Sequence, residues 1–334
     1  MEEKDDKSRN YVEPKAFKNL ISKKNPLFKG VKACDSKDLI IFLLEGMDNE
    51  LTERNNQSKK KIIFQGKNIN DMNEENFKKS HNSIFADLFY GFQLSTMQCL
   101  SCQNLDTTYT IFNFLIFPLE KTYNSLNQMN DSNMNNNMCY NMINNMNSYY
   151  PNNMGSRGNN QYSPFNMPTV IIPRSRKLTL KKNDDDIKRK LKLEDCFKEN
   201  ESQENLCGPN QIYCNSCHKY SDARTKSGIY TAPNVLILIL NRGRGNYFKC
   251  DLDFPHKLDI SKFVGNQESP KIYNLIGVIS HLGESSMEGH FIAYCKHFDD
   301  NWYLFNDGIV TTVNETDIYK GTPYILFYQN KDIK

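Results

Sequence analysis

Two stretches of the sequence decide the fold: Gly289–Tyr294, which reads GHFIAY, and Phe305–Val310, which reads FNDGIV. Phe291–Lys296 and Trp302–Phe305 have the apolar and aromatic content of β-strands, and Asp299-Asp300 between them predicts a hairpin turn. His290 would then stand at the start of one strand and Asn306-Asp307 at the end of the next. This hairpin would place His290 and Asn306 side by side. A histidine whose second ring nitrogen is held by an amide or carboxylate oxygen can act as a general base. On local sequence alone, a histidine beside a turn is more often a structural surface or core residue than a catalytic one.

Further strand signals surround this hairpin in the last third of the chain, separated by Gly, Asp and Asn turn residues. They are Val235–Leu240, Phe248–Phe254, Tyr273–His281, Trp302–Phe305 and Tyr324–Tyr328. Such short connections are typical of antiparallel sheets.

Nearer the N-terminus, Asp35–Leu51 predicts a helix capped by Asp35. Its apolar residues repeat at helical spacing and should face the core; they are Leu39, Ile40, Leu43, Leu44, Met47 and Leu51. A helical segment joined to an antiparallel sheet predicts the α+β class.

Two C-x2-C pairs point to a metal site: Cys99 with Cys102, and Cys214 with Cys217. Thiolates two residues apart on a tight turn can bind one ion together, and two such pairs complete a tetrahedral zinc site. Four protein ligands leave no position for water, so this zinc would be structural. The alternative is that free cysteines are paired by chance. We expect His218, beside the second pair, to be a bystander.

An Asn- and Met-rich tract separates the two cysteine pairs, and its composition predicts a disordered insertion from 121 to 162. The flanking segments, Tyr109–Leu119 and Thr169–Leu180, have strand character. Because the entropy of loop closure grows slowly with loop length, the insertion does not prevent the cysteine pairs from meeting.

The composition of the 334-residue chain is globular, with 38% hydrophobic and 24% charged residues. Its net charge of +3 argues against nucleic acid or an anionic membrane as a partner. The longest apolar runs, Leu39–Leu44 and Val235–Leu240, are far shorter than the roughly 20 residues of a membrane span. The first residues have no secretory signal character, so we expect reduced cysteines and a cytoplasmic and/or nuclear location.

Together, Gly289–Tyr294, Trp302 and Phe305–Val310 resemble the His box of ubiquitin-specific proteases. Asp35–Asp38, ahead of Leu43-Leu44, is similar to the Gln-Asp-Ala-x-Glu-Phe helix of that family. The segments around the two cysteine pairs resemble its zinc-finger knuckles. The resemblance covers a domain from about residue 12 to 329, apart from the Asn-rich tract.

This resemblance implies a papain-like cysteine protease fold of the ubiquitin-specific protease type. It would have an antiparallel palm, zinc-ribbon fingers and a partial thumb. The family cleaves after the C-terminal Gly-Gly of ubiquitin, so ubiquitin and ubiquitinated proteins are the expected partners. We expect a monomer.

Carried over to this sequence, the resemblance makes His290 the general base and Asn306 the residue that orients it. Asp307 is the alternative or assisting acceptor. The nucleophile of the family lies in an N-terminal Gly-x-x-Asn-x-Gly-Asn-x-Cys box, and nothing from Met1 to Gly30 resembles that box. Cys34 is the nearest cysteine, but it occupies the Gln position at a helix start and is not expected to be the nucleophile.

Two explanations keep the chain an enzyme. Either the nucleophile lies upstream in a longer protein, which we favour, or a separate polypeptide supplies it. The alternative is a pseudoprotease that binds ubiquitin or another partner without cleaving it. A zinc-ribbon protein that binds nucleic acid is a third possibility, against which the near-neutral charge argues.

Overall fold

The computed structural model describes residues 14–30, 34–56, 83–130, 190–243, 247–283 and 289–333. Residues 135–188 fall in a second unit that lies outside these ranges, so the account below concerns the rest of the chain. In the described part, no helix is long and apolar enough to cross a membrane.

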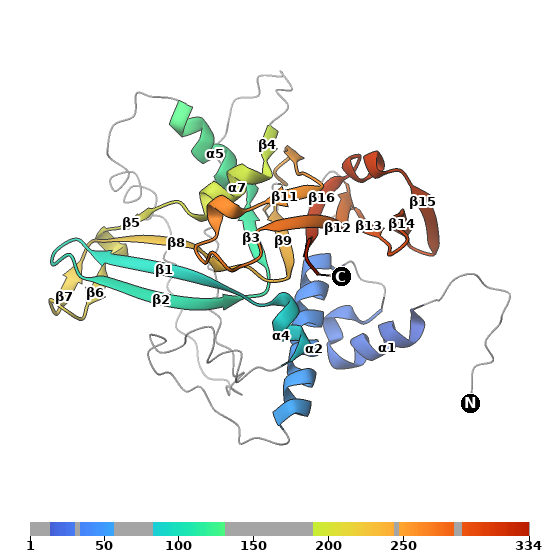
Figure 1. Cartoon of the computed structure of the whole chain (residues 1–334), viewed down its shortest axis with the longest axis horizontal. Helices are drawn as coiled ribbons and strands as arrows, with labels where there is room; N and C mark the ends of the chain where they lie inside the picture. Colours follow the sequence, from blue (N-terminus) through green and yellow to red (C-terminus); the bar gives the residue numbers. More distant parts are fainter. Residues whose placement is uncertain are drawn as a thin grey trace. The chain divides into compact units, whose positions relative to one another are not determined.

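An eight-stranded sheet forms the centre of the described structure (Figure 1). Seven strands follow one another in the order β15 (Ile309–Val313), β14 (Trp302–Asn306), β13 (His290–Lys296), β12 (Ile272–Leu282), β16 (Thr322–Asn330), β9 (Val235–Asn241) and β3 (Leu115–Pro118). The eighth, β11 (Lys257–Asp259), pairs with β12. All pairs are antiparallel except β3 with β9, which confirms the antiparallel character predicted from the short turns.

Strand β9 explains why the sheet has a core on both faces. Side chains alternate along a strand, and the side chains of Leu236, Leu238 and Leu240 join one hydrophobic cluster while those of Ile237 and Ile239 join another. All five are at most 1% exposed. Burial of each such side chain contributes about 1.5–3 kcal/mol, so β9 is the strand that anchors both layers.

The two faces of the sheet are covered by different helices. Helices α5 (Leu119–Asn130) and α7 (Leu193–Asn200) pack on the larger cluster, where the rings of Phe117 and Phe197 meet edge to face at 5.0 Å. On the other face, α2 (Ser36–Asn56) and α4 (Ile84–Phe89) contribute Leu44 and Phe85. Figure 1 shows α5 and α7 above the sheet, and α2 and α4 below it.

Helix α2 begins as the sequence predicts, because Asp35 Oδ1 accepts a hydrogen bond from the Lys37 backbone N–H at 2.9 Å. Its predicted core stripe is wrong in part. Met47 is 45% exposed, whereas Asp48 is only 5% exposed and accepts a hydrogen bond from the Tyr90 hydroxyl at 2.7 Å. The inward-facing residues are Leu44, Asp48 and Leu51, and the half-buried Tyr90 supplies the hydrogen bond that the buried Asp48 carboxylate needs.

A second, four-stranded antiparallel sheet carries the cysteine pairs. Its order is β2 (Leu105–Phe112), β1 (Gly91–Cys99), β8 (Ala223–Thr231) and β5 (Glu204–Leu206), and the hairpin of β6 (Ile212–Cys214) and β7 (Lys219–Ser221) follows β5 in the chain. The remaining short elements are α1 (Lys15–Lys24), β4 (Lys190–Lys192), β10 (Asp251–Asp253), η1 (Pro26–Phe28), η3 (Gly208–Asn210), η4 (Ser261–Phe263) and η5 (Glu315–Tyr319).

The start of the predicted insertion is also wrong. Residues 121–130 belong to helix α5, not to a disordered tract. Thr122 is buried, and the side chains of Tyr123 and Leu126 pack against the larger cluster. These apolar contacts offset the ordering entropy despite the Asn-rich composition. Residues 131–162, and the strand predicted at Thr169–Leu180, lie outside the described residues.

Candidate active site and metal centre

The predicted hairpin positions a histidine and an asparagine as a pair. Strands β13 and β14 are antiparallel neighbours, with Ala293 opposite Phe305. His290 begins β13 and Asn306 ends β14, and the His290 Nε2 atom lies 2.7 Å from Asn306 Oδ1. Because an amide oxygen can only accept, this contact needs a proton on Nε2, and in a neutral ring the lone pair is then on Nδ1. The pair therefore has the arrangement of a base held by an orienting acceptor.

Asp307 lies beside this pair. Its Oδ2 atom is 3.7 Å from His290 Nε2, and its side chain is 82% exposed. Asp307 and Gly308 form the two-residue turn between β14 and β15, in which Asp307 adopts a φ of 51°. Asp and Gly are the residues that such hairpin turns favour. The turn thus holds the carboxylate next to the imidazole, at a longer distance than the amide.

A second histidine supports the strand that carries His290. His281 on β12 lies opposite Phe291 of β13, and its side chain is 6% exposed. A Cβ atom on Gly289 would lie 2.2 Å from His281 Nε2. Only glycine therefore fits at the position that precedes His290. This contact depends on the pairing of β12 with β13.

The N-terminus of α2 is tied to the same region. The Tyr324 hydroxyl donates to Asp35 Oδ2 at 2.7 Å, and the rings of Tyr324 and Phe291 lie 5.3 Å apart. Burial lowers the pKa of His281, while Asp35 opposes that shift and Arg242 adds to it. Sequence reasoning missed Tyr324 and Arg242 because their role depends on contacts between distant segments.

No cysteine sulfur among the described residues lies within hydrogen-bonding distance of the His290 ring. The Cys34 thiol donates instead to the backbone carbonyl of Leu27 at 3.1 Å. The described site thus contains the His290–Asn306 pair without a thiol.

The four predicted metal ligands form one cluster. The Sγ atoms of Cys99, Cys102, Cys214 and Cys217 all lie within 4.8 Å of one another. Cys99 is 3.9 Å from Cys217, and Cys102 is 3.6 Å from Cys214, measured between sulfurs. Four sulfurs placed 2.3 Å from a tetrahedral ion are about 3.8 Å apart. The cluster therefore fits a metal ion of the size and geometry of zinc.

The two halves of the cluster are built alike. In each knuckle, the residue after the second cysteine donates its backbone N–H to the carbonyl of the first cysteine, Gln103 to Cys99 at 2.9 Å and His218 to Cys214 at 2.8 Å. Both donors have a positive φ, 62° and 53°. A hydrogen bond from the Ser221 hydroxyl, together with backbone hydrogen bonds of Cys102 and Ser101, lowers the pKa of Cys99. Burial and the neighbouring thiols raise the pKa of Cys217, and the pKa of Cys102 is raised as well.

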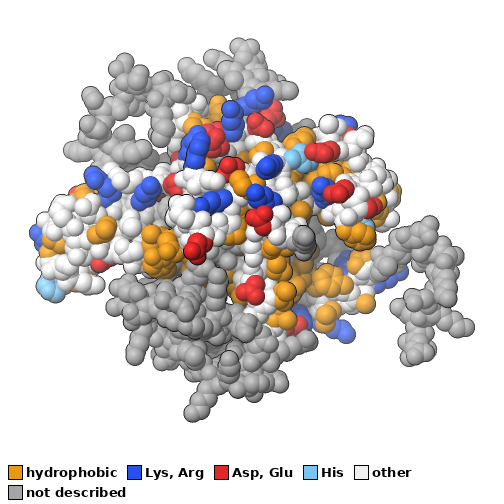
Figure 2. All heavy atoms as spheres, in the orientation of Figure 1, with side chains coloured by type: hydrophobic (Ala, Val, Ile, Leu, Met, Phe, Trp, Pro, Cys, Tyr) orange, Lys and Arg blue, Asp and Glu red, His pale blue; other side chains and the backbone are white. Residues whose placement is uncertain are grey.

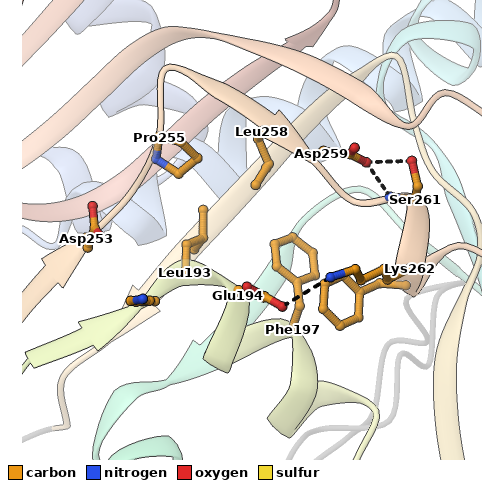
Figure 3. A pocket seen from close by; sticks show the side chains of 11 residues that line it. Leu193, Glu194, Phe197, Asp253, Pro255, Leu258, Asp259, Ser261 and Lys262 are labelled. Atoms are coloured by element: carbon orange, nitrogen blue, oxygen red, sulfur yellow. Dashed lines mark hydrogen bonds and ion pairs between the residues drawn. The ribbon is translucent and has the colours of Figure 1, made fainter.

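The described structure also has a cavity of about 380 Å³ between α7 and the segment from β10 to η4 (Figure 3). Leu193, Phe197 and Leu258 give it apolar walls, and Lys262 Nζ lies 3.9 Å from Glu194 Oε1 at its edge. None of its lining residues belongs to the histidine pair or the cysteine cluster.

Comparison with known proteins identifies the family. The family model described as ubiquitin carboxyl-terminal hydrolase matches residues 1–328. The chain belongs to this family. The family resemblance of the His box and the cysteine knuckles is therefore confirmed. The catalytic roles of His290, Asn306 and Asp307 stay predictions.

Individual hydrolases of the family match parts of the chain. Ubiquitin carboxyl-terminal hydrolase 8 of Saccharomyces cerevisiae is 34% identical over 164 residues, which are 44% of this chain and 34% of the relative. Human ubiquitin carboxyl-terminal hydrolase 15 is 35% identical over 150 residues, 42% of this chain and 15% of the relative. The matched portions thus span about a third or less of these relatives.

Solved structures confirm the fold. The SAGA DUB module Ubp8/Sgf11/Sus1/Sgf73 bound to ubiquitin aldehyde matches with a TM-score of 0.55 at 21% identity, covering 95% of this chain and 53% of that one. A SAGA DUB module bound to monoubiquitin matches with a TM-score of 0.57 at 20% identity and the same coverage. The fold is therefore the α+β fold of ubiquitin-specific proteases, with antiparallel sheets and a cysteine cluster.

Proposed function

We propose that this chain is the base-bearing part of a cysteine-type deubiquitinase that cleaves after the C-terminal Gly-Gly of ubiquitin. The observation that carries the proposal is the 2.7 Å contact between His290 Nε2 and Asn306 Oδ1. Family membership supports the reaction class, because the family consists of ubiquitin carboxyl-terminal hydrolases.

In this proposal, His290 takes the proton from a cysteine thiol, and Asn306 holds the ring in the tautomer that leaves Nδ1 free for the transfer. Asp307, 3.7 Å from Nε2, stabilises the imidazolium that forms. The thiolate then attacks the carbonyl carbon of the terminal ubiquitin glycine. The C–N bond to the substrate then breaks as the His290 imidazolium gives its proton to the leaving amine, and ubiquitin remains bound to the cysteine as a thioester. His290 next takes a proton from the water that hydrolyses this thioester, which releases ubiquitin and the thiol.

We propose further that the nucleophile comes from polypeptide outside residues 1–334. Two observations support this: no described thiol contacts His290, and the curated relatives are about three or more times longer than their matched portions. The competing function is a pseudoprotease that binds ubiquitin without cleaving it. The same lack of a thiol at His290 favours that alternative.

The experiment compares the 1–334 chain with a longer chain encoded upstream in the same reading frame, using a fluorogenic ubiquitin C-terminal amide. We expect ubiquitin binding by both chains and turnover by the longer one only. His290→Ala should abolish turnover without abolishing binding. If the longer chain has no cysteine box and only binds ubiquitin, the pseudoprotease is correct. If neither chain binds ubiquitin, both functions are wrong.

The cysteine cluster is proposed to hold one structural zinc ion, since four thiolates leave no open coordination position. We also propose that the chain is monomeric and works in the cytoplasm and/or nucleus. The expectation that its cysteines are all reduced is wrong for Cys207, which is disulfide-bonded in the structure. Lys and Arg side chains are interspersed with Asp and Glu on the face shown in Figure 2. This mixture supports a protein partner more than a nucleic acid.

A further inference from the structure

We propose that β15 is a docking edge for the ubiquitinated substrate itself. The occupant is an extended segment of the substrate protein that is uncharged and β-prone in the middle and basic at both ends. It would add to the eight-stranded sheet as a further strand. The identity of the occupant rests on the proposed function, because it requires that a ubiquitinated protein is bound at His290.

Strand β15 is the terminal strand of the sheet. It pairs with β14 from Trp302–Val313 to Asn306–Ile309. Among the described residues, no other strand or backbone group pairs with its outer edge. An unpaired edge presents a row of N–H and C=O groups, and an extended peptide can satisfy these groups by adding a strand.

The sequence of β15 lacks the features that protect open edges. It reads IVTTV, with four exposed residues followed by a half-buried valine. Ile309 is 65% exposed and Val310 is 47% exposed. Natural edge strands are usually protected by a lysine, a proline or a bulge, and β15 has no charge, no proline and an unbroken register with β14. β-Branched residues with high strand propensity therefore stand uncovered in solvent.

The position of this edge relates it to the candidate active site. Ile309 lies directly opposite Asn306 in the β14–β15 register. Residues opposite each other in an antiparallel pair project from the same face of the sheet. The exposed Ile309 side chain therefore shares its face with the side chain that holds His290. A segment paired along β15 would lie three strand spacings, roughly 14 Å, from β13, the strand that begins at His290.

Charge at the two ends of the edge specifies the partner. Asp307, with an 82% exposed side chain, precedes β15, and Glu315, with a 62% exposed side chain, follows it. His256 Nε2 lies 3.0 Å from Glu315 Oε1. Basic residues at both ends of an incoming strand would therefore meet opposite charge, whereas its middle would meet only Val and Thr side chains.

The same charges argue against a second copy of this chain as the occupant. Antiparallel pairing of two β15 strands centred on Thr311 would place Asp307 of each copy opposite Glu315 of the other. Like charges directly opposite each other destabilise a strand pair. A heterologous segment with basic ends avoids this repulsion.

The test uses the labelled peptide acetyl-KKTVTVTKK-amide as the probe, with the 1–334 chain and fluorescence anisotropy as the readout. We expect saturable binding. Thr311→Lys should weaken it about tenfold or more, because a lysine on the edge repels the cationic probe and opposes strand addition. Thr108→Lys is the matched control, since Thr108 is an exposed residue of β2, the edge strand of the other sheet. It should leave the affinity within about twofold.

A second peptide distinguishes binding by strand addition from binding through side chains and charge alone. N-methylation of the central residues keeps the side chains and charges but removes the backbone donors, so this peptide should not bind. Equal binding of both peptides would overturn the proposal. Glu315→Gln should weaken binding of the unmodified probe and reduce its salt dependence. Unchanged binding and unchanged salt dependence would overturn the charge argument for the basic ends.

Ubiquitin affinity is measured in parallel for every variant. If the probe does not bind while ubiquitin does, the docking edge is wrong and the proposed function stands. If ubiquitin does not bind either, the proposed function is wrong as well. Sedimentation completes the test: a concentration-dependent dimer that Thr311→Lys abolishes would show that a second copy occupies the edge, which contradicts the proposal.

Discussion

Gly289 is the residue at which the candidate active site tolerates least change. Its backbone lies against the ring of His281, and a methyl group there would also lie 2.7 Å from the Leu282 carbonyl oxygen. We expect Gly289→Ala to destabilise the protein by about 1–3 kcal/mol, the usual effect of overpacking. Urea denaturation measures this change.

Gly308→Ala is the matched control for that variant, because the added methyl group would meet no atom within 4 Å. It should change the free energy of unfolding much less than Gly289→Ala. Equal losses at the two glycines would contradict the close approach of Gly289 to His281.

His281 should make stability depend on pH. Burial lowers its pKa below the ordinary value of 6.5, so the unfolded chain takes up a proton more readily than the folded protein. The free energy of unfolding must then decrease as the pH falls through about 6.5. We expect the wild-type protein to lose more stability than His281→Asn between about pH 7.5 and pH 5.

Denaturation curves of the two proteins at matched pH values check this prediction. The other titrating groups, including the cysteine cluster and His256, are common to both proteins, so the difference isolates His281. Parallel loss of stability in the two proteins would show that the imidazole titrates equally in the folded and unfolded states.

At the scale of elements, the paired knuckles form one unit, because β1 ends at Cys99 and β6 ends at Cys214. Zinc bound by all four thiolates would contribute its binding free energy to folding of this unit. We expect Cys99→Ser to lower the zinc content from one ion per chain towards zero and to lower the Tm by more than about 5 °C.

Cys295→Ser provides the control for this variant, because Cys295 is an exposed thiol on β13 outside the cluster. It should keep both the zinc content and the Tm. Metal analysis and calorimetry measure the two quantities. Absence of zinc from the wild-type protein would contradict the metal site. So would a Tm that Cys99→Ser leaves unchanged.

Local signals explain which elements could be predicted from the sequence. The β13–β14 hairpin and the two knuckles depend on turn residues and on short spacings between residues. Both kinds of signal can be read directly from the sequence. The prediction from composition was wrong at α5. Leu126 lies in an Asn-rich segment, but its side chain packs against the larger hydrophobic cluster. The strand β15 was not predicted, because its pairing with β14 keeps it extended and most of its residues are exposed.

Contacts across the sheet could not be predicted in the same way. The approach of Gly289 to His281 requires the register of β12 with β13, and the bond from Tyr324 to Asp35 joins residues at opposite ends of the chain. The exposed Met47 shows a related limit: helical periodicity predicts an apolar stripe, but the neighbouring helix α4 and Tyr90 determine which side of α2 is buried.

At the scale of the whole molecule, helices cover both faces of the large sheet, and no described strand pairs with the outer edge of β15. His290 and Asn306 lie on two neighbouring strands of this sheet. In the proposed function, this pair supplies the base and its acceptor, the cysteine cluster holds the zinc ion, and the thiol comes from beyond residues 1–334.

Ubiquitin with a thiol-reactive electrophile at its C-terminus tests this central claim most directly. The adduct is located by mass spectrometry after reaction with the 1–334 chain and with the longer chain. We predict no adduct on the 1–334 chain and one adduct on the longer chain, at a cysteine outside residues 1–334. Its rate should fall by orders of magnitude with His290→Ala. An adduct on Cys34, formed by the 1–334 chain and dependent on His290, would contradict the account.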